Sequence, residues 1–79
     1  MNNTIRAEIK KRITDVALKS GISDSKNQKV VESIAKKYGI SLVDVYVEQE
    51  RQMCEALGYT FKDEKSYRIM LEEVLNMEV

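Results

Sequence analysis

The chain has 79 residues, 43% of them hydrophobic and 33% charged, and its 13 basic and 13 acidic residues cancel to a formal net charge of zero. A chain of this length forms one small domain, residues 1–79, in which almost all apolar residues are needed for the core. It has no histidine and a single cysteine, Cys54. These counts exclude a structural zinc site, an internal disulfide and a Cys–His or Ser–His catalytic pair, and no glycine-rich phosphate loop is present. We therefore expect a protein that is not an enzyme and needs no metal or cofactor.

The sequence also carries no signal for a membrane. No apolar run approaches the roughly 18 residues of a membrane span, and the N-terminal segment MNNTIRAEIKKR lacks the apolar stretch of a signal peptide. A lone cysteine suits a reducing compartment. The sequence therefore predicts a cytoplasmic protein that makes no membrane contact.

The charges are divided between the two halves of the chain. Residues 1–39 hold nine basic and four acidic side chains, a balance of +5, and residues 40–79 hold four and nine, a balance of −5. One interpretation is that the two halves attract each other in the folded protein. The other is that the first half presents a basic face to nucleic acid or to an acidic partner.

Four helices are predicted, separated by Gly21, Gly39 and Gly58, because glycine followed by an apolar residue is typical of a left-handed helix C-cap. The first helix is expected over residues 4–20. Its apolar stripe consists of Ile5, Ile9, Ile13, Val16 and Ala17. The second helix is expected to begin after Ser25, which has the capping-box spacing to Gln28. Its stripe consists of Val30, Val31, Ile34, Ala35 and Tyr38.

The third helix is predicted from Ser41, whose hydroxyl can cap it, with Asp44 favoured by the positive end of the helix dipole. Residues 42–47 (LVDVYV) also alternate β-branched side chains as a strand does, but no partner strand of sufficient length exists. The fourth helix follows Thr60 or Asp63, with Tyr59 and Phe61 filling the corner before it. Its inward face is predicted to contain Tyr67, Met70, Leu71, Val74 and Leu75. The expected fold is all-α, a compact bundle of four short helices.

Residues 31–50 resemble a helix-turn-helix. Ala35 is small where two helices would cross, Gly39 makes the turn, and apolar residues stand at positions that the motif buries. These are Ile34, Tyr38, Ile40 and Val45. Glu48 occupies the position of a final buried aliphatic residue, which is a departure from the pattern. The resemblance implies a helix-turn-helix-like corner between the second and third helices, and a DNA-binding role as one hypothesis.

The side chains of the third helix do not suit a DNA reader. The residues that would face the major groove are Ser41, Leu42, Val43, Tyr46, Val47 and Glu50. Most of them are largely apolar, whereas base reading requires hydrogen-bond donors and acceptors. Residues 41–57 also carry four acidic residues and one arginine, a balance of −3 that phosphate repels. On a helical wheel the same helix has two apolar sides, and its polar side contains Asp44, Glu48, Arg51, Gln52 and Glu55.

Such a helix is either packed between neighbours in its own chain or shared with a partner. The second alternative predicts a partner-binding surface at Val43, Val47, Glu50 and Cys54. The preferred function is a small non-catalytic protein-interaction module or regulator that binds another protein, or a second copy of itself as a homodimer. The alternative is a helix-turn-helix transcriptional regulator, in which the second helix contacts DNA phosphates through Lys26, Lys29, Lys36 and Lys37.

Overall fold

The computed structural model describes the backbone of residues 1–15 and 25–77, and the side chains of residues 1–12 and 25–76. These residues form helices and no strand, which confirms the all-α prediction. The helices are α1 (Asn3–Asp15), α3 (Ser25–Tyr38), α4 (Leu42–Leu57) and α5 (Glu64–Met77). The predicted end of the first helix, Gly21 and the side chains of Ile13, Val16 and Ala17 lie outside the described residues. None of the described helices is long and apolar enough to cross a membrane.

The helix-turn-helix-like corner between α3 and α4 is present, and local capping explains it. Gly39 has φ of 65°, a left-handed conformation that glycine adopts without steric penalty. The Ile40 N–H donates to the Ala35 carbonyl at 3.1 Å, as in a glycine C-cap. The Ser41 hydroxyl accepts a hydrogen bond from the Asp44 N–H at 3.1 Å, which confirms Ser41 as the N-cap of α4.

The other helix ends follow the same logic, with one correction. Gly58 (φ 78°) ends α4, as predicted. Of the two predicted caps of α5, Thr60 and Asp63, the structure has Asp63, whose carboxylate accepts the Ser66 N–H at 3.2 Å. Ser25 is the first residue of α3 and not the residue before it, so the predicted capping box with Gln28 does not form the helix start.

The core lies where α1, α3 and α4 meet. Its buried residues are Ile5 and Ile9 of α1, Val31, Ile34 and Ala35 of α3, and Val45 of α4. A polar pair is buried in the same region. The Asn27 amide donates to Gln49 at 3.1 Å, and the Gln49 amide donates back at 2.6 Å, so the two amides satisfy each other.

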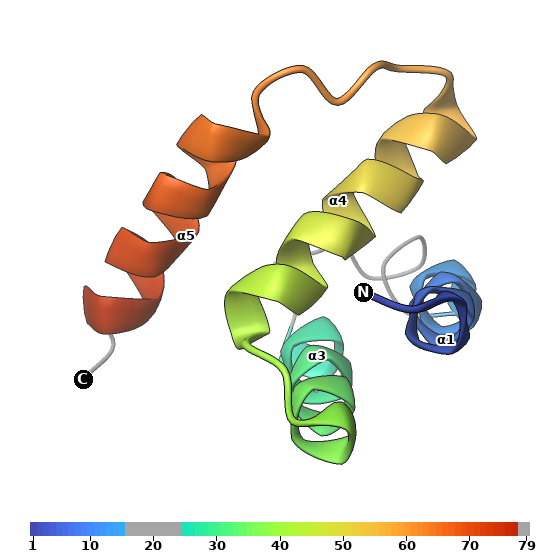
Figure 1. The fold of residues 1–79 in the computed structure, drawn as a ribbon, viewed down its shortest axis with the longest axis horizontal. Helices are drawn as coiled ribbons and strands as arrows, with labels where there is room; N and C mark the ends of the chain where they lie inside the picture. Colours follow the sequence, from blue (N-terminus) through green and yellow to red (C-terminus); the bar gives the residue numbers. More distant parts are fainter. Residues whose placement is uncertain (16–24, 78–79) are drawn as a thin grey trace.

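The helix α4 is the centre of the arrangement. It contacts α1, α3 and α5, and α1 also contacts α3, whereas α5 contacts α4 alone among the described helices. Figure 1 shows α5 on one side of α4, with α1 and α3 on the other. The two apolar sides of α4 are therefore both covered by the chain itself, which is the first of the two arrangements that the sequence allows.

Candidate functional site

Of the predicted partner-binding residues, Val47 is inside the molecule and only 1% exposed. Val43, Glu50 and Cys54 are half-buried. In this conformation the Val47 side chain cannot contact a partner, because α4 packs against other helices on both sides. Partner binding by Val43, Glu50 and Cys54 stays a prediction.

The helix α5 lies over the side of α4 that carries Glu50 and Cys54. Burial raises the pKa of Tyr67 on α5 to about 12, and the nearby Glu50 carboxylate adds to this shift. The Cys54 thiol donates a weak hydrogen bond to Glu50 Oε1 at 3.7 Å. Burial and the Glu50 charge raise the pKa of Cys54, so the thiol stays protonated and poorly nucleophilic near neutral pH.

The remaining surface of α4 does not offer a face to a DNA groove. Every side chain from residue 42 to residue 54 is buried or half-buried, and exposed side chains begin only at Glu55. A recognition helix has to project several polar side chains beyond the rest of the protein to reach base edges. In this conformation α4 has no such exposed row.

Glu48 is the largest departure from the sequence interpretation of α4. The wheel places it on the polar side of the helix, yet it is only 5% exposed. A helix-turn-helix buries the residue at this position, and the fold does the same with a carboxylate in place of an aliphatic side chain. Arg6 Nε lies 3.3 Å from Glu48 Oε1, and Arg51 Nη1 donates to the same oxygen at 3.2 Å. This pairing offsets the cost of removing the charge from water.

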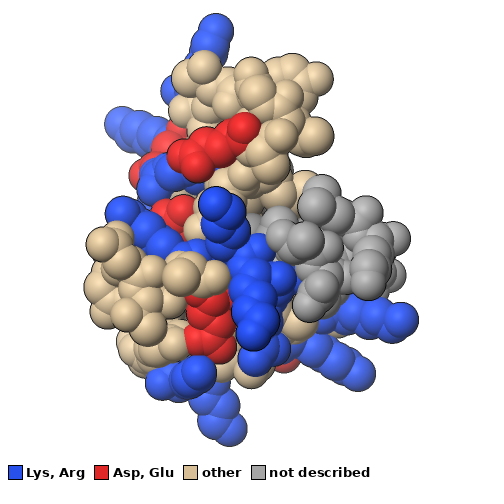
Figure 2. Space-filling view, turned by 90° about the vertical axis from the view of Figure 1, so that its right-hand side faces the viewer, with Lys and Arg blue, Asp and Glu red and all other residues tan. Residues whose placement is uncertain are grey.

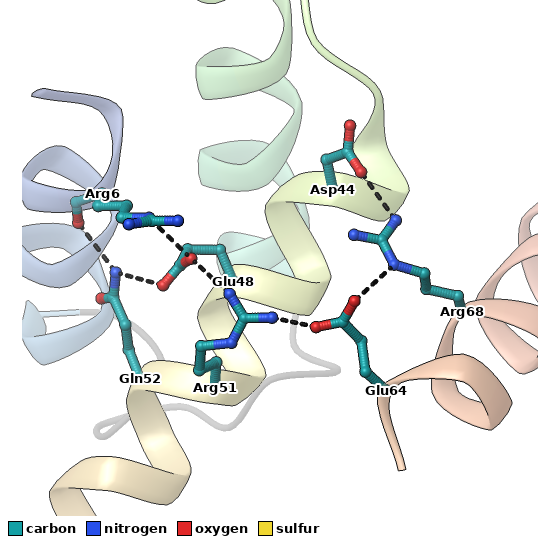
Figure 3. Close-up of polar contacts among 7 residues, drawn as sticks. All are labelled: Arg6, Asp44, Glu48, Arg51, Gln52, Glu64 and Arg68. Carbon is teal, nitrogen blue, oxygen red and sulfur yellow. Dashed lines mark hydrogen bonds and ion pairs between the residues drawn. The ribbon is translucent and has the colours of Figure 1, made fainter. Parts of the chain in front are cut away.

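Glu48 belongs to a set of polar side chains that joins three helices, which we call the charged network (Figure 3). It starts at Arg6 of α1, crosses α4 and ends at Arg68 of α5. Its members are Arg6, Asp44, Glu48, Arg51, Gln52, Glu64 and Arg68. Three arginines face three carboxylates, so the network is electrically balanced.

On the α5 side of the charged network, Arg68 and Arg51 share the Glu64 carboxylate. Arg68 donates to Asp44 at 2.8 Å and to Glu64 at 3.2 Å, and Arg51 also donates to Glu64. The hydrogen bonds from Arg68 lower the pKa of both carboxyl groups. Asp44 and Glu64 are therefore ionised well below neutral pH, and these ion pairs connect α5 to α4.

Two hollows border the charged network. One has a volume of about 220 Å³, the other about 300 Å³, and both are lined in part by Arg6, Glu48 and Arg51. The first hollow is also bordered by Ile40 and Arg68, and we call it the arginine pocket. Within the part of the chain that the structure describes, no group of three or more cysteine, aspartate or glutamate side chains is placed to hold a metal ion.

The four lysines of the DNA-binding alternative, Lys26, Lys29, Lys36 and Lys37, are all exposed on α3. Lys37 forms an ion pair: its amine lies 3.2 Å from Glu8 of α1. The Tyr38 hydroxyl also donates to Glu8, and these two contacts lower the pKa of the carboxyl group. Figure 2 shows the side of the molecule that carries α1, where lysine and arginine side chains are numerous and carboxylates lie between them.

Large apolar side chains are exposed at α5 and just before it. Ile69 is 50% exposed, and Met70 and Val74 are each 46% exposed. The prediction that Met70 and Val74 belong to the inward face of this helix is therefore wrong, because among the described helices α5 contacts only α4, and among the described side chains of α5 only Leu71 is fully buried. Phe61 packs edge-on against Tyr67 with ring centroids 5.8 Å apart, as expected for the corner. Tyr59, by contrast, is 69% exposed and does not fill that corner.

No protein-family model, no curated protein and no solved structure matches this chain.

Proposed function

We propose that the chain is a non-catalytic protein-interaction module and that it binds another protein through Met70 and Val74 of α5. These two side chains, which we call the α5 patch, are four residues apart and lie on the same face of the helix. The single observation that carries the proposal is their exposure, 46% each, on a helix that contacts only one of the other described helices. An amphipathic partner segment on this face would bury apolar surface that the folded chain leaves in water.

The negative charge beside the α5 patch indicates which kind of partner it would bind. Glu73 is exposed on the same helix, three residues after Met70 and therefore on the same side as the patch. A partner segment with apolar side chains flanked by lysine or arginine complements this surface, because rim charges of opposite sign favour association and orient it. The first half of the chain itself is basic, so a second copy is one protein that meets the requirement.

This binding surface lies on α5, whereas the sequence interpretation had placed it on α4. The third helix of the sequence interpretation, α4, has no exposed side chain before Glu55 and serves as the internal support. Val43, Glu50 and Cys54 lie under or beside α5, so a partner on the α5 patch would reach these residues only at the edge of its contact area.

The test compares two variants of neighbouring exposed residues. Met70→Lys with Val74→Lys changes the α5 patch, and Ile69→Lys is the matched control, because Ile69 is similarly exposed but lies about 100° from Met70 and about 140° from Val74 on the wheel. Each protein is immobilised and used to capture proteins from an extract of the organism that makes it. We expect wild type and Ile69→Lys to retain the same partner and the double variant to lose it. Equal retention by all three proteins would overturn the assignment of the patch.

Self-association is the simplest form of the same proposal, and it needs no extract. Light scattering after size exclusion gives the mass of the wild-type particle over a range of concentrations. A dimer that Met70→Lys with Val74→Lys abolishes, and that Ile69→Lys leaves intact, would identify the partner as a second copy. A monomer at all concentrations would leave a different protein as the partner.

A DNA-binding role is the second candidate, favoured by the exposure of all four α3 lysines. It predicts phosphate contact without base reading, since α4 carries a charge balance of −3 over residues 41–57. Titration of the protein onto mixed-sequence duplex DNA separates the two candidates. Binding that weakens steeply between about 50 and 200 mM salt, and that Lys29→Gln with Lys36→Gln reduces, would support this role. No retardation even at low salt would eliminate it.

A further inference from the structure

The arginine pocket gathers three guanidinium groups from three different helices. Arg6 comes from α1, Arg51 from α4 and Arg68 from α5. Its volume of about 220 Å³ is well above the roughly 10–15 Å³ that a single water molecule requires on the same measure. The space is therefore large enough for a small anion together with some of its water.

Two of the arginines that line the pocket, Arg6 and Arg68, have N–H donors that make no hydrogen bond to a described residue. Arg68 donates through Nε and Nη1 to Glu64 and Asp44, and Arg6 approaches Glu48 through Nε. Within the described residues, Nη2 of Arg68 and both Nη atoms of Arg6 make no hydrogen bond. Figure 3 shows the ends of these two side chains directed toward each other from opposite sides of the central helix. A guanidinium is a rigid fork of five N–H donors, so the unused donors lie in known planes.

The acceptors that line the pocket are already engaged. Asp44 and Glu48 are its two carboxylates, against three arginines and Met1, whose N-terminal amine is close enough to Asp44 to lower the pKa of that carboxyl, so the lining is net positive. Glu64, the third carboxylate of the charged network, lies outside the lining. Ile40 and Val47 provide apolar wall, which lowers the local dielectric and strengthens a charge–charge contact.

We propose that the arginine pocket binds a small phosphate-type oxyanion, held between Arg6 on α1 and Arg68 on α5. The tetrahedral oxygens of phosphate accept paired hydrogen bonds from guanidinium forks. Such an anion would link the two helices that flank α4 and would use N–H donors of Arg6 and Arg68 that the charged network does not engage; these side chains are 47% and 38% exposed. The proposal concerns a different surface from the α5 patch and does not depend on it.

The test titrates sodium phosphate, and separately glycerol 3-phosphate, onto the protein at pH 7.5 with sodium chloride at matched ionic strength as the reference. Binding is followed by the NMR signals of labelled arginine side chains and by ³¹P line broadening. We expect saturable shifts of the Arg6 and Arg68 signals with both phosphates and not with chloride. Tighter binding of the monoester would further assign the apolar wall to the ester group.

Variants localise the effect. Arg6→Gln and Arg68→Gln should each weaken phosphate binding at least tenfold. Arg12→Gln is the matched control, because Arg12 lies on α1, pairs with Glu8 and is not part of the pocket. Circular dichroism confirms that each variant is folded, and the wild-type NMR titration tests phosphate binding even if one variant does not fold. Shifts that follow ionic strength alone, or equal binding by Arg12→Gln and both pocket variants, would overturn the proposal.

Discussion

The helices α1, α3 and α4 form one region of the molecule, and α5 forms another that is built differently. In the first region the core cluster contains six buried apolar residues from three helices, together with the mutually hydrogen-bonded Asn27–Gln49 pair. In the second region, among the described side chains, Leu71 is the buried residue that α5 contributes. Tyr67 and Leu75 of α5 are half-buried, and ion pairs of Glu64 with Arg51 and of Arg68 with Asp44 add to the contact with α4. The first region is therefore stabilised mainly by apolar burial, and α5 by a smaller apolar contact together with ion pairs.

This difference has an energetic consequence. Burial of apolar surface contributes about 25 cal/mol per Å², whereas ion pairs between partly exposed side chains contribute between zero and about 1 kcal/mol each. The side chains of Arg68 and Asp44 are 38% and 44% exposed, so their pair belongs to the weak class. We therefore expect α5 to open locally at a lower free energy than the unfolding of the whole chain.

The largest effect should follow a change in the three-helix region. Ile34→Ala removes a side chain that is 2% exposed, and we expect the free energy of unfolding to fall by about 2–5 kcal/mol. Urea denaturation followed by circular dichroism measures it. Val74→Ala, at a position 46% exposed on α5, is the control and should change stability by less than about 0.5 kcal/mol. A loss below about 1 kcal/mol for Ile34→Ala would show that the core is elsewhere.

A smaller and more local effect is expected from Leu71→Ala, the corresponding change on α5. Leu71 is 8% exposed, and its loss should lower the stability of the α4–α5 contact by about 2 kcal/mol, at the low end of the range for leucine. Backbone NMR shifts should then change along α5 and at Tyr67 while α1 and α3 keep theirs. Global unfolding of the variant in the absence of urea would contradict the separation of the two regions.

The buried amide pair should give the next effect. Gln49→Ala leaves the Asn27 amide without its Gln49 partner, at an expected cost of about 1–3 kcal/mol. A double-mutant cycle with Asn27→Ala isolates the contact between the two side chains and should give a coupling energy above about 0.5 kcal/mol. Gln28→Ala, at an exposed position of α3, is the control. Additive single changes would mean that the two amides do not depend on each other.

The smallest effect at neutral pH should come from Arg68→Gln, which should cost under about 1 kcal/mol through its pair with Asp44 and less still at high salt. The variant should differ from the wild type more clearly in how its stability changes as the pH falls. Because Arg68 depresses the pKa of Asp44 and Glu64, the stability that they contribute is present above their ordinary pKa values of 3.8 and 4.5, and it is lost as pH falls through the depressed values. Between about pH 5 and 2 the wild type should therefore lose more stability than Arg68→Gln, measured by urea midpoints. Parallel acid curves would contradict this role.

Much of the fold could be predicted because its signals are local. Gly39, Gly58 and Ser41 act within a few residues of their own position, and the structure shows each in the predicted capping role. The stripe that contains Ile5 and Ile9 is a periodicity within one helix. The two apolar sides of α4 predicted a helix covered on both sides, and they left open whether the chain itself or a partner covers the second side.

The parts that could not be predicted depend on partners distant in sequence. Glu48 is buried because Arg6, 42 positions earlier, reaches it from α1. Met70 and Val74 are exposed because, in the part of the chain that the structure describes, α5 contacts α4 and no second helix, and the α5 sequence alone does not contain that information. The sequence therefore assigned partner binding to Val47, which the fold encloses, whereas the exposed residues are Met70 and Val74, which the periodicity had assigned to the inside.

Amide hydrogen exchange tests the comparison between the two regions most directly. The rates are measured at neutral pH, residue by residue, for the helices of the native protein. We predict that amides of α3 and α4 exchange only through global unfolding, while those of α5 exchange through a local opening of lower free energy that Leu71→Ala lowers further. Protection of α5 equal to that of α4, with the same dependence on urea, would contradict the claim that α5 is a separately attached helix.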